Sequence, residues 1–257
     1  MVKPILVLAL LAVGLAACGG SETSGEDAPA TSTRTVTTTT TSAPPPLTET
    51  QARTPLVVYY LRDGRIAPAR VTVESTPAVA HAALDALGDE PPAGYSSDVA
   101  DAGDLDVRIE DGIARLDWGD ETLSHAGAAQ VVYTLTQFPT VRAVELPDGR
   151  QARRAAFEDV TPLILIDKPL PGDTVRNPLG VAGTASVYEA TLVVELVQEG
   201  KVLEKQTVTA STGAPYRGSF STTFETTAGG DASIVAFSPS AADGSEQHRV
   251  EVPIHIG

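Results

Sequence analysis

The spacing of apolar residues changes once along this chain, and that change limits the possible folds more than any other feature. Between residues 55 and 150, strand-like apolar runs are interspersed with two stretches of helical spacing. From Thr161 to Gly257 the helical spacing disappears, and short alternating runs are separated by Gly, Pro and Asp turns. The sequence therefore predicts an α+β multidomain chain, in which an α/β domain precedes an all-β domain.

The first domain is predicted to contain two helices. Thr76 and Pro77 are typical of an N-cap followed by proline in the first turn, so one helix is expected to run to Leu87 and to stop at Gly88. The other is expected over 124–138, with Ser124 at its start. Each helix carries one apolar stripe, formed by Ala80, Ala83, Leu84 and Leu87 in the first and by Ala128, Val131, Val132 and Leu135 in the second.

Strands of the first domain are predicted at 56–61, 70–74, 105–110, 113–118 and 141–146. Asp111-Gly112 is a strong signal for a two-residue hairpin turn between the third and fourth of these strands. Trp118 and Tyr133 could line a ligand pocket, but a place in the core is the more common role for such residues. The segment from Gln151 to Val160 is expected to join this domain to the next.

The second domain has the size and rhythm of an immunoglobulin-like sandwich with seven strands. Glu199-Gly200 and Asp243-Gly244 supply hairpin turns. The even positions of the last strand, from Val250 to Ile256, should face the core. No cysteine pair or tryptophan occurs here, so aliphatic packing must hold the core together. The strands are predicted at 163–166, 179–187, 191–198, 201–209, 219–226, 232–237 and 247–256.

Two known families resemble these domains. The segment from Val57 to Arg150 resembles the GerMN domain of bacterial sporulation and spore-germination proteins, through Val58-Tyr59-Tyr60-Leu61, Glu110-Asp111-Gly112-Ile113-Ala114 and above all the residues from Val131 to Pro139. The loop after the first helix departs from the family pattern. The resemblance implies a fold similar to the ring-building modules of envelope machines, which assemble by domain contacts and are not enzymes.

The segment from Ile164 to Ile256 resembles the Gmad2 family, the immunoglobulin-like domain of bacterial spore-germination proteins. The residues that carry this resemblance include Pro169-Leu170-Pro171-Gly172, Val181-Ala182-Gly183-Thr184-Ala185 and Phe237-Ser238-Pro239-Ser240. GerMN followed by Gmad2 is itself a known arrangement. We therefore predict a GerMN domain over 55–158 and a Gmad2 domain over 161–257.

The N-terminal segment ends in the only cysteine of the chain. Lys3 precedes an apolar run that is too short to span a bilayer stably, and Ala16 and Ala17 stand directly before Cys18. Leu15-Ala16-Ala17-Cys18 resembles the bacterial lipobox, which implies cleavage before Cys18 and a diacylglycerol on its thiol. We expect a lipoprotein signal peptide over 1–17, and export with lipid anchoring at Cys18 to the outer face of the bacterial cell membrane; the alternative is a plain secretory signal.

Residues 18–54 are rich in Thr, Ser and Pro and have almost no large aliphatic residues, so they cannot form a core. We expect a disordered tether between the lipid and the folded domains. As a random coil it would span on the order of 35 Å, and as polyproline II about 110 Å. O-glycosylation of the Thr/Pro tract is an alternative reason for its composition.

No pattern in the sequence indicates catalysis or a metal site. A Gly-x-Ser-x-Gly turn, a Walker loop and paired Cys or His at zinc spacing are all missing. Asp120, Ser124 and His125 permit a triad, but Ser124 and His125 are neighbours at a helix start, where they point apart. Other candidates are ordinary surface groups: four scattered histidines (His81, His125, His248, His255) and four loop aspartates without the spacing of a calcium site (Asp98, Asp101, Asp104, Asp106).

The formal net charge of −15 argues against nucleic acid as a partner, because binding to phosphates depends on clustered Lys and Arg. The predicted function is a non-catalytic, lipid-anchored interaction or scaffold protein of the cell envelope, without a cofactor and without a known small-molecule substrate, that binds the membrane through Cys18 and unidentified envelope proteins through its domains. Complexes of the sporulation or germination type are one setting for it. The alternative is a ligand-binding lipoprotein that serves a transporter or senses cell-wall fragments.

Overall fold

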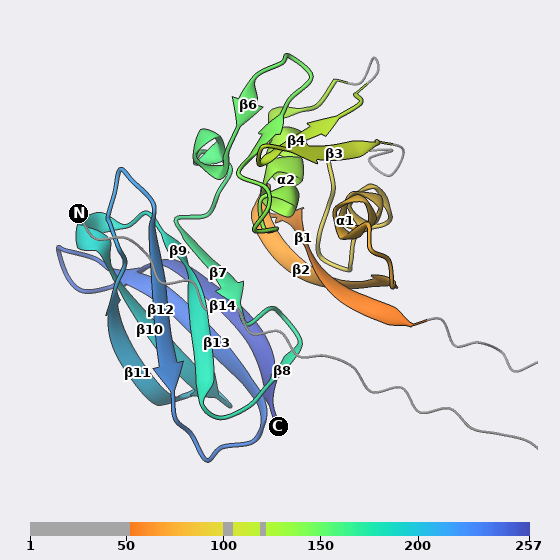
Figure 1. Cartoon of the computed structure of the whole chain (residues 1–257). Coiled ribbons are helices and arrows are strands. Elements are labelled where there is room, and N and C mark those ends of the chain that lie inside the picture. The colour runs from red at the N-terminus through yellow and green to blue at the C-terminus, as the bar shows by residue number, and fades with distance from the viewer. Residues whose placement is uncertain (1–51, 100–104, 119–121) are drawn as a thin grey trace, which may run out of the picture. The chain divides into compact units, whose positions relative to one another are not determined.

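The computed structural model describes residues 52–99, 105–118 and 122–257, and all of them belong to one compact unit (Figure 1). Two large hydrophobic cores lie in this unit, one built mainly by residues before Thr161 and one by residues after Pro162. The predicted order of an α/β domain followed by an immunoglobulin-like β-sandwich is confirmed.

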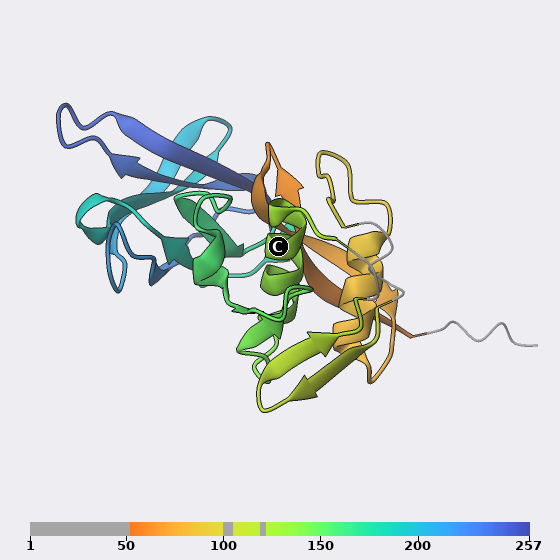
Figure 2. The same ribbon diagram turned by 90° about the horizontal axis from the view of Figure 1, so that it is seen from above.

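The first domain contains a separate hairpin and a small sheet, with α2 between them (Figures 1 and 2). The hairpin strands are β1 (Arg53–Arg62) and β2 (Arg65–Glu74), which are antiparallel. The sheet has the order β3 (Val107–Glu110), β4 (Ile113–Leu116), β5 (Ala143–Glu145), β6 (Gln151–Ala152), with β4 and β5 parallel. The helices are α1 (Val79–Gly88), α2 (His125–Leu135) and the 3-10 turn η2 (Arg154–Phe157).

Helix α2 is buried well beyond its predicted stripe. Ala128, Val131, Val132 and Leu135 are buried as expected, but so are the polar residues Gln130 and Thr134, at 0% exposure. Their side chains form hydrogen bonds with backbone groups on the outer edge of β1. The Tyr59 N–H donates to Thr134 Oγ1 at 3.1 Å, and Gln130 Nε2 donates to the Tyr59 carbonyl at 3.5 Å. Because this strand edge has no neighbouring strand there, helix side chains take the role of one.

The helix ends differ from the prediction in two places. Thr76 is not the N-cap of α1; its Oγ1 accepts from the Ala78 N–H at 3.1 Å, and the helix starts at Val79, after a bend at Pro77. Helix α2 ends at Leu135, because the Phe138 N–H turns back to the Leu135 carbonyl instead of continuing the helical pattern. The predicted cap at Ser124 is confirmed by a hydrogen bond from the Gly127 N–H at 2.9 Å.

The second domain pairs a five-stranded sheet, β11-β10-β13-β14-β8, with a three-stranded sheet, β12-β9-β7. All seven predicted strands are present within a few residues: β7 (Ile164–Lys168), β9 (Leu179–Ala185), β10 (Thr191–Gln198), β11 (Lys201–Thr209), β12 (Gly218–Phe224), β13 (Gly230–Pro239) and β14 (Glu246–Ile256). Strand β8 (Asp173–Val175) was not predicted, because it is only three residues long; it pairs in parallel with the end of β14.

Aliphatic residues fill the space between the two sheets. Along β14, Val252, Ile254 and Ile256 face this core and Val250 packs against it, as predicted. Glu199 and Gly200 both have positive φ and close the β10–β11 hairpin as expected. Asp243-Gly244 is not a two-residue hairpin turn, because it lies in a six-residue connection closed by the Gly244 N–H on the Ser240 carbonyl.

Strand β7 belongs to both cores. Side chains alternate along a strand, so Ile164 and Ile166 pack inside the sandwich while Leu165 packs in the core of the first domain. The segment that the sequence suggested as a connector, 151–160, is also part of the first domain: it forms β6 and η2, and Phe157 is 1% exposed. The two domains therefore join along a packed boundary.

Candidate functional site at the junction of the two domains

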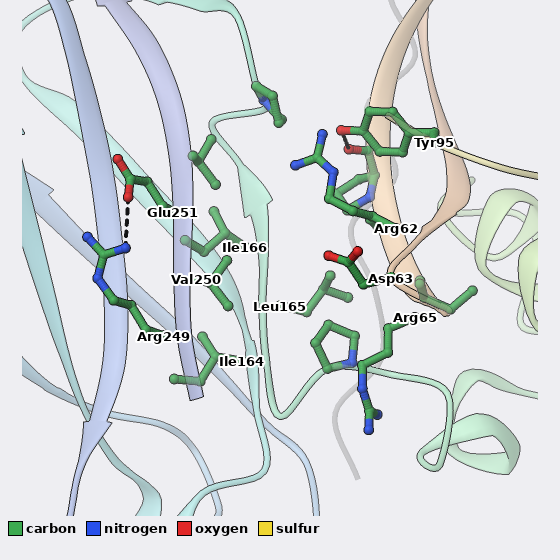
Figure 3. Close-up of a pocket in the computed structure, with 16 residues that line it drawn as sticks. Arg62, Asp63, Arg65, Tyr95, Ile164, Leu165, Ile166, Arg249, Val250 and Glu251 are labelled. Carbon is green, nitrogen blue, oxygen red and sulfur yellow. Dashed lines mark hydrogen bonds and ion pairs between the residues drawn. The ribbon is translucent and has the colours of Figure 1, made fainter. Parts of the chain in front are cut away.

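A groove of about 350 Å³ lies where the β1–β2 hairpin meets β7 and β14 (Figure 3). Its apolar floor includes Ile164, Leu165 and Val250, and its charged rim includes Arg62, Arg65 and Arg249. Figure 3 shows Arg62 and Tyr95 on one side of the groove and Ile166 and Val250 on the other. An apolar floor with a few charged groups at the rim is typical of a ligand or peptide site.

The hairpin turn that brings the rim residues to the groove is Asp63-Gly64. Both residues have positive φ, at 52° and 71°, which matches the type I′ turn preferred between twisted strands. The turn places Arg62 and Arg65 opposite each other as a cross-strand pair. The second strand was predicted to begin only at Arg70, so this turn was missed, although Asp-Gly was the signal that could have shown it.

The rim arginines of the hairpin have no carboxylate partner among the described residues. The Arg62 guanidinium lies 4.2 Å from the centroid of the Tyr95 ring, and Arg65 Nη1 donates to the carbonyls of Asp159 and Thr161 at 3.2 and 3.4 Å. Arg249, in contrast, bonds Glu251 at 2.7 Å and so lowers the pKa of that carboxyl. An anionic group in the groove would therefore find two guanidinium groups without an ion-pair partner among the described residues, in a lining that also contains the carboxylates of Asp63 and Glu251.

A buried polar cluster next to the groove holds the two domains together. Tyr59 Oη of β1 donates to Asp167 Oδ1 of β7 at 2.8 Å, and Tyr133 Oη of α2 lies 2.8 Å from Thr161 Oγ1. The Arg154 guanidinium lies 4.9 Å from the Tyr59 ring centroid and 4.7 Å from that of Tyr133. The polar groups of this cluster are thus matched internally, as buried groups require.

Burial decides the protonation of this cluster. It raises the pKa of Tyr59, and the charge of Asp167 raises it further. Burial also raises the pKa of the Asp167 carboxyl, against the Tyr59 hydrogen bond and the positive charges of Arg154 and Arg217, which lower it. The tyrosine therefore remains a proton donor, a role that suits a structural joint rather than an acid–base catalyst.

Two further arginines connect the domains. Arg217, 10% exposed, donates from Nε to both carboxylate oxygens of Glu158 at 3.0 and 2.9 Å, and from Nη2 to the Pro162 carbonyl at 2.9 Å. Arg70 forms a bidentate pair with Asp173 at 2.8 and 2.9 Å but is 43% exposed. The Arg217–Glu158 link is largely buried, whereas the Arg70–Asp173 pair is exposed to solvent. The two links should therefore contribute unequally to the stability of the domain boundary.

The residues considered for a triad do not form one among the described residues. Ser124 Oγ caps α2 and lies 3.1 Å from Asp98 Oδ2, while His125 Nε2 pairs with Asp159 Oδ1 at 2.9 Å. Asp120 lies outside the described residues. The imidazole therefore faces a surface carboxylate, and the serine hydroxyl serves the helix terminus.

The other candidates occupy structural positions. Trp118 is buried, and its Nε1 donates to the Glu145 carbonyl at 2.9 Å, while Tyr133 is 1% exposed, so both belong to the core as expected. His81 and His255 pair with surface aspartates. Across the described part of the chain no group of His, Cys, Asp and Glu could hold a metal ion. Asp101 and Asp104 of the aspartate loop lie outside that part.

Cys18 also lies outside the described residues, so its lipidation stays a prediction. The described helices include none with the length and hydropathy needed to cross a bilayer. The predicted tether lies almost entirely outside the described residues as well; β1 begins at Arg53, three residues before the predicted strand.

These features define a class: a two-domain protein in which an α/β domain is fused by a buried polar joint to an immunoglobulin-like sandwich. A family model matches each of the two domains. Residues 57–150 match Germane, described as "Sporulation and spore germination", and residues 163–245 match Gmad2, described as "Immunoglobulin-like domain of bacterial spore germination". The chain thus contains one domain of each spore-germination family.

Other comparisons are weaker. No curated protein matches the sequence. Among solved structures, the tandem GerMN domains of the sporulation protein GerM from Bacillus subtilis are 15% identical, with a TM-score of 0.33 over 69% of this chain and 63% of theirs. An engineered protein is 12% identical, with a TM-score of 0.29 over 53% of this chain and 37% of its own. The chain thus spans less than two thirds of either structure, and the domain assignment depends on the family models.

Proposed function

We propose that this chain is a non-catalytic interaction or scaffold protein of the bacterial cell envelope, anchored by a lipid on Cys18 and acting in complexes of the sporulation or germination type. The two families to which its domains belong support the setting. The lipobox-like Leu15-Ala16-Ala17-Cys18 supports the anchor. A lipid tether would confine both domains near membrane partners and raise the probability of weak encounters.

The observation that carries the proposal is the open edge of the five-stranded sheet. Strand β11 is the edge strand next to β10, and its Val202 and Leu203 are 43% and 40% exposed. An exposed edge strand with apolar side chains is a template for pairing with another chain, and on β11 these apolar side chains lie between the charged residues Lys201 and Glu204. We therefore propose that the main protein contact lies at residues 201–204.

The proposed contact can be tested by photocrosslinking in intact cells. A photoreactive amino acid at Leu203 should yield a discrete crosslinked complex, whereas the same probe at Asp148, in an exposed turn of the first domain, should not. Val202→Lys should remove the complex without lowering the melting temperature. Absence of any complex at Leu203, or complexes of equal yield at both positions, would contradict the assignment of the edge.

The anchor and the absence of catalysis need their own measurements. A Cys18→Ser protein should leave the membrane fraction or accumulate unprocessed, and normal processing with membrane retention would refute the anchor.

The purified protein should hydrolyse neither peptidoglycan nor esters. Hydrolysis that a single Ser, His, Asp or Glu substitution abolishes would show that the protein is an enzyme.

The groove between the domains favours a second candidate function, the binding of an anionic ligand with an apolar part. Its floor is apolar, and Arg62 and Arg65 have no carboxylate partner among the described residues. Titration with a short-chain fatty acid should show saturable binding that Arg62→Gln weakens. Arg150→Gln, which alters an arginine outside the groove lining, serves as the control.

A further inference from the structure

One end of the sandwich gathers three connections of the second domain (Figures 1 and 2). They are residues 186–190 with the 3-10 turn η3 (Tyr188–Ala190), the β11–β12 connection at 210–217, and the β13–β14 connection at 240–245. The Ala214 N–H donates to the Val187 carbonyl at 2.9 Å, which joins the first two. A groove of about 310 Å³ lies among the three and is separate from the groove at the domain junction.

Two tyrosines project from this end. Tyr188 and Tyr216 are each 71% exposed, the highest values among the large apolar and aromatic residues described. Leu163, at 38%, lines the same groove as Tyr188. Exposed aromatic residues on adjoining loops at the end of a β-sandwich are typical of a recognition surface, because a ring offers a large contact area for little loss of conformational freedom.

The loop backbone beneath Tyr188 is held firmly. Glu189 and Ala190 both have left-handed backbone conformations, with φ of 51° and 56°, which residues other than glycine rarely adopt. Gly213 packs so closely that a Cβ there would lie 2.5 Å from the Ala190 nitrogen. Two adjacent strained residues are maintained only where the surrounding packing imposes them, and such sites cluster at binding surfaces.

The groove is largely apolar, carries a few polar side chains (Ser186, Ser238, Gln247 and His248) and contains no acidic residue, lysine or arginine, although 20% of the chain is charged. Ser186 is only 7% exposed as a residue, but its hydroxyl, for which the described residues supply no hydrogen-bond partner, remains accessible to solvent in the groove. The side chains of Gln247 and His248, which also line the groove, likewise have no hydrogen-bond partner among the described residues. These accessible polar groups are free to form hydrogen bonds with a ligand in the groove.

We propose that this end of the sandwich binds an uncharged saccharide. The volume lies at the lower end of the range for small-molecule sites and is too small for a folded partner. The neutral lining offers donors and acceptors for sugar hydroxyls, and the negative π face of Tyr188 suits the partly positive C–H face of a pyranose ring. This inference goes beyond the proposed scaffold role and does not depend on it.

The test is calorimetric titration of the purified full-length chain with two neutral probes, cellotetraose and the β-1,4-linked tetramer of N-acetylglucosamine, and with one charged probe, tetragalacturonate. At least one neutral probe should bind saturably, and the charged probe should not. Tyr188→Ala should weaken binding by about tenfold, the loss expected for one aromatic contact, whereas Tyr188→Phe should retain it. Ser186→Ala should also weaken binding.

Ile109→Ala is the control, because this residue is also an exposed apolar side chain, at 40%, but lies on β3 of the first domain, outside the groove lining and outside the proposed protein contact. This control should leave the affinity for the saccharide unchanged. Because the Tyr188 side chain is exposed, the melting temperatures of Tyr188→Ala, Tyr188→Phe and the parent should agree. The proposal is overturned if neither neutral probe binds, if Tyr188→Ala binds as tightly as the parent, or if tetragalacturonate binds as tightly as the neutral probes.

Discussion

At the scale of single residues, buried polar side chains determine how this protein is held together. Gln130 and Thr134 would be unexpected in a helix core, yet each satisfies a backbone group of Tyr59. Tyr59 in turn bonds Asp167, 108 positions further along the chain. A buried polar group without a partner would cost about 1–3 kcal/mol, so each of these residues depends on the others.

Asp167 should give the folded state a characteristic pH dependence. Its pKa is raised in the folded state, chiefly by burial, so the folded state binds a proton more strongly than the unfolded state does. The contribution of this group to stability is therefore greatest below the pKa of the unfolded state and is lost as the pH rises through the folded pKa. Urea melts across a pH range of about 3 to 8 should show that Asp167→Asn loses stability relative to the parent as the pH falls.

Asp173 provides a control of opposite sign at the same boundary. Burial alone would raise the pKa of Asp173, but the hydrogen bonds from Arg70 and from the Leu170 backbone N–H outweigh it and lower the pKa. Its contribution is present above the unfolded pKa and is lost as the pH falls. Asp173→Asn should therefore gain stability relative to the parent on acidification. If both variants change in the same direction as the pH falls, one of the two assignments is wrong.

At the scale of elements, close approach of backbones decides the position of β7. Gly183 of β9 faces β7 so closely that a Cβ would lie 2.1 Å from the Leu165 carbonyl oxygen and 3.0 Å from the Ile166 Cα. Since Leu165 packs into the first core and Ile166 into the second, this contact fixes the strand that both domains share.

Gly183→Ala should therefore destabilise the protein by about 1–3 kcal/mol, the usual cost of overpacking a site that cannot relax freely. Gly180 lies on the same strand, and a Cβ added there would meet no atom within 4 Å, so Gly180→Ala should be neutral or stabilising by about 0.4–1 kcal/mol. Denaturant melts of the two variants give the comparison. Equal effects would show that the contact between β9 and β7 is not tight.

At the scale of the whole molecule, the described domains form one compact unit in which β7, the polar cluster and two arginine links cross the boundary. This arrangement differs from two modules on a flexible connector. Surfaces on both domains, such as the β11 edge and the groove at the junction, are then presented at a fixed separation. That property suits a protein that assembles partners.

The two arginine links should differ in strength. Arg217→Ala removes hydrogen bonds to Glu158 and Pro162 from a site that is 10% exposed, and should cost about 1.5–3 kcal/mol, the range for hydrogen bonds to charged groups. Arg70→Ala removes an exposed ion pair and should cost less than about 1 kcal/mol. Calorimetric melts measure both. A larger loss for Arg70→Ala would place the main link on the solvent side.

Most elements of this chain can be predicted from the amino-acid sequence, the exceptions being the short β6, η2 and β8 and the first half of β2. The strand and helix positions, the buried stripes of both helices and the turns at Asp111-Gly112 and Glu199-Gly200 depend on spacing and turn chemistry within a few residues. The family resemblance added the domain types, which the family models confirm. Local sequence signals are sufficient for these helices, strands and turns, because the backbone preference of each depends on residues that are close together in the chain.

The contacts between distant segments could not be predicted from the sequence and are seen in the folded chain alone. The predicted connector became part of the first core, Tyr59 found Asp167, Ser186 came to line a groove with residues from distant loops, and Arg62 and Arg65 reached the junction of the two domains. None of these pairings has a local signature. Each arises because side chains from segments far apart in sequence must together fill one boundary and satisfy its polar groups, and that requirement exists only once the chain has folded.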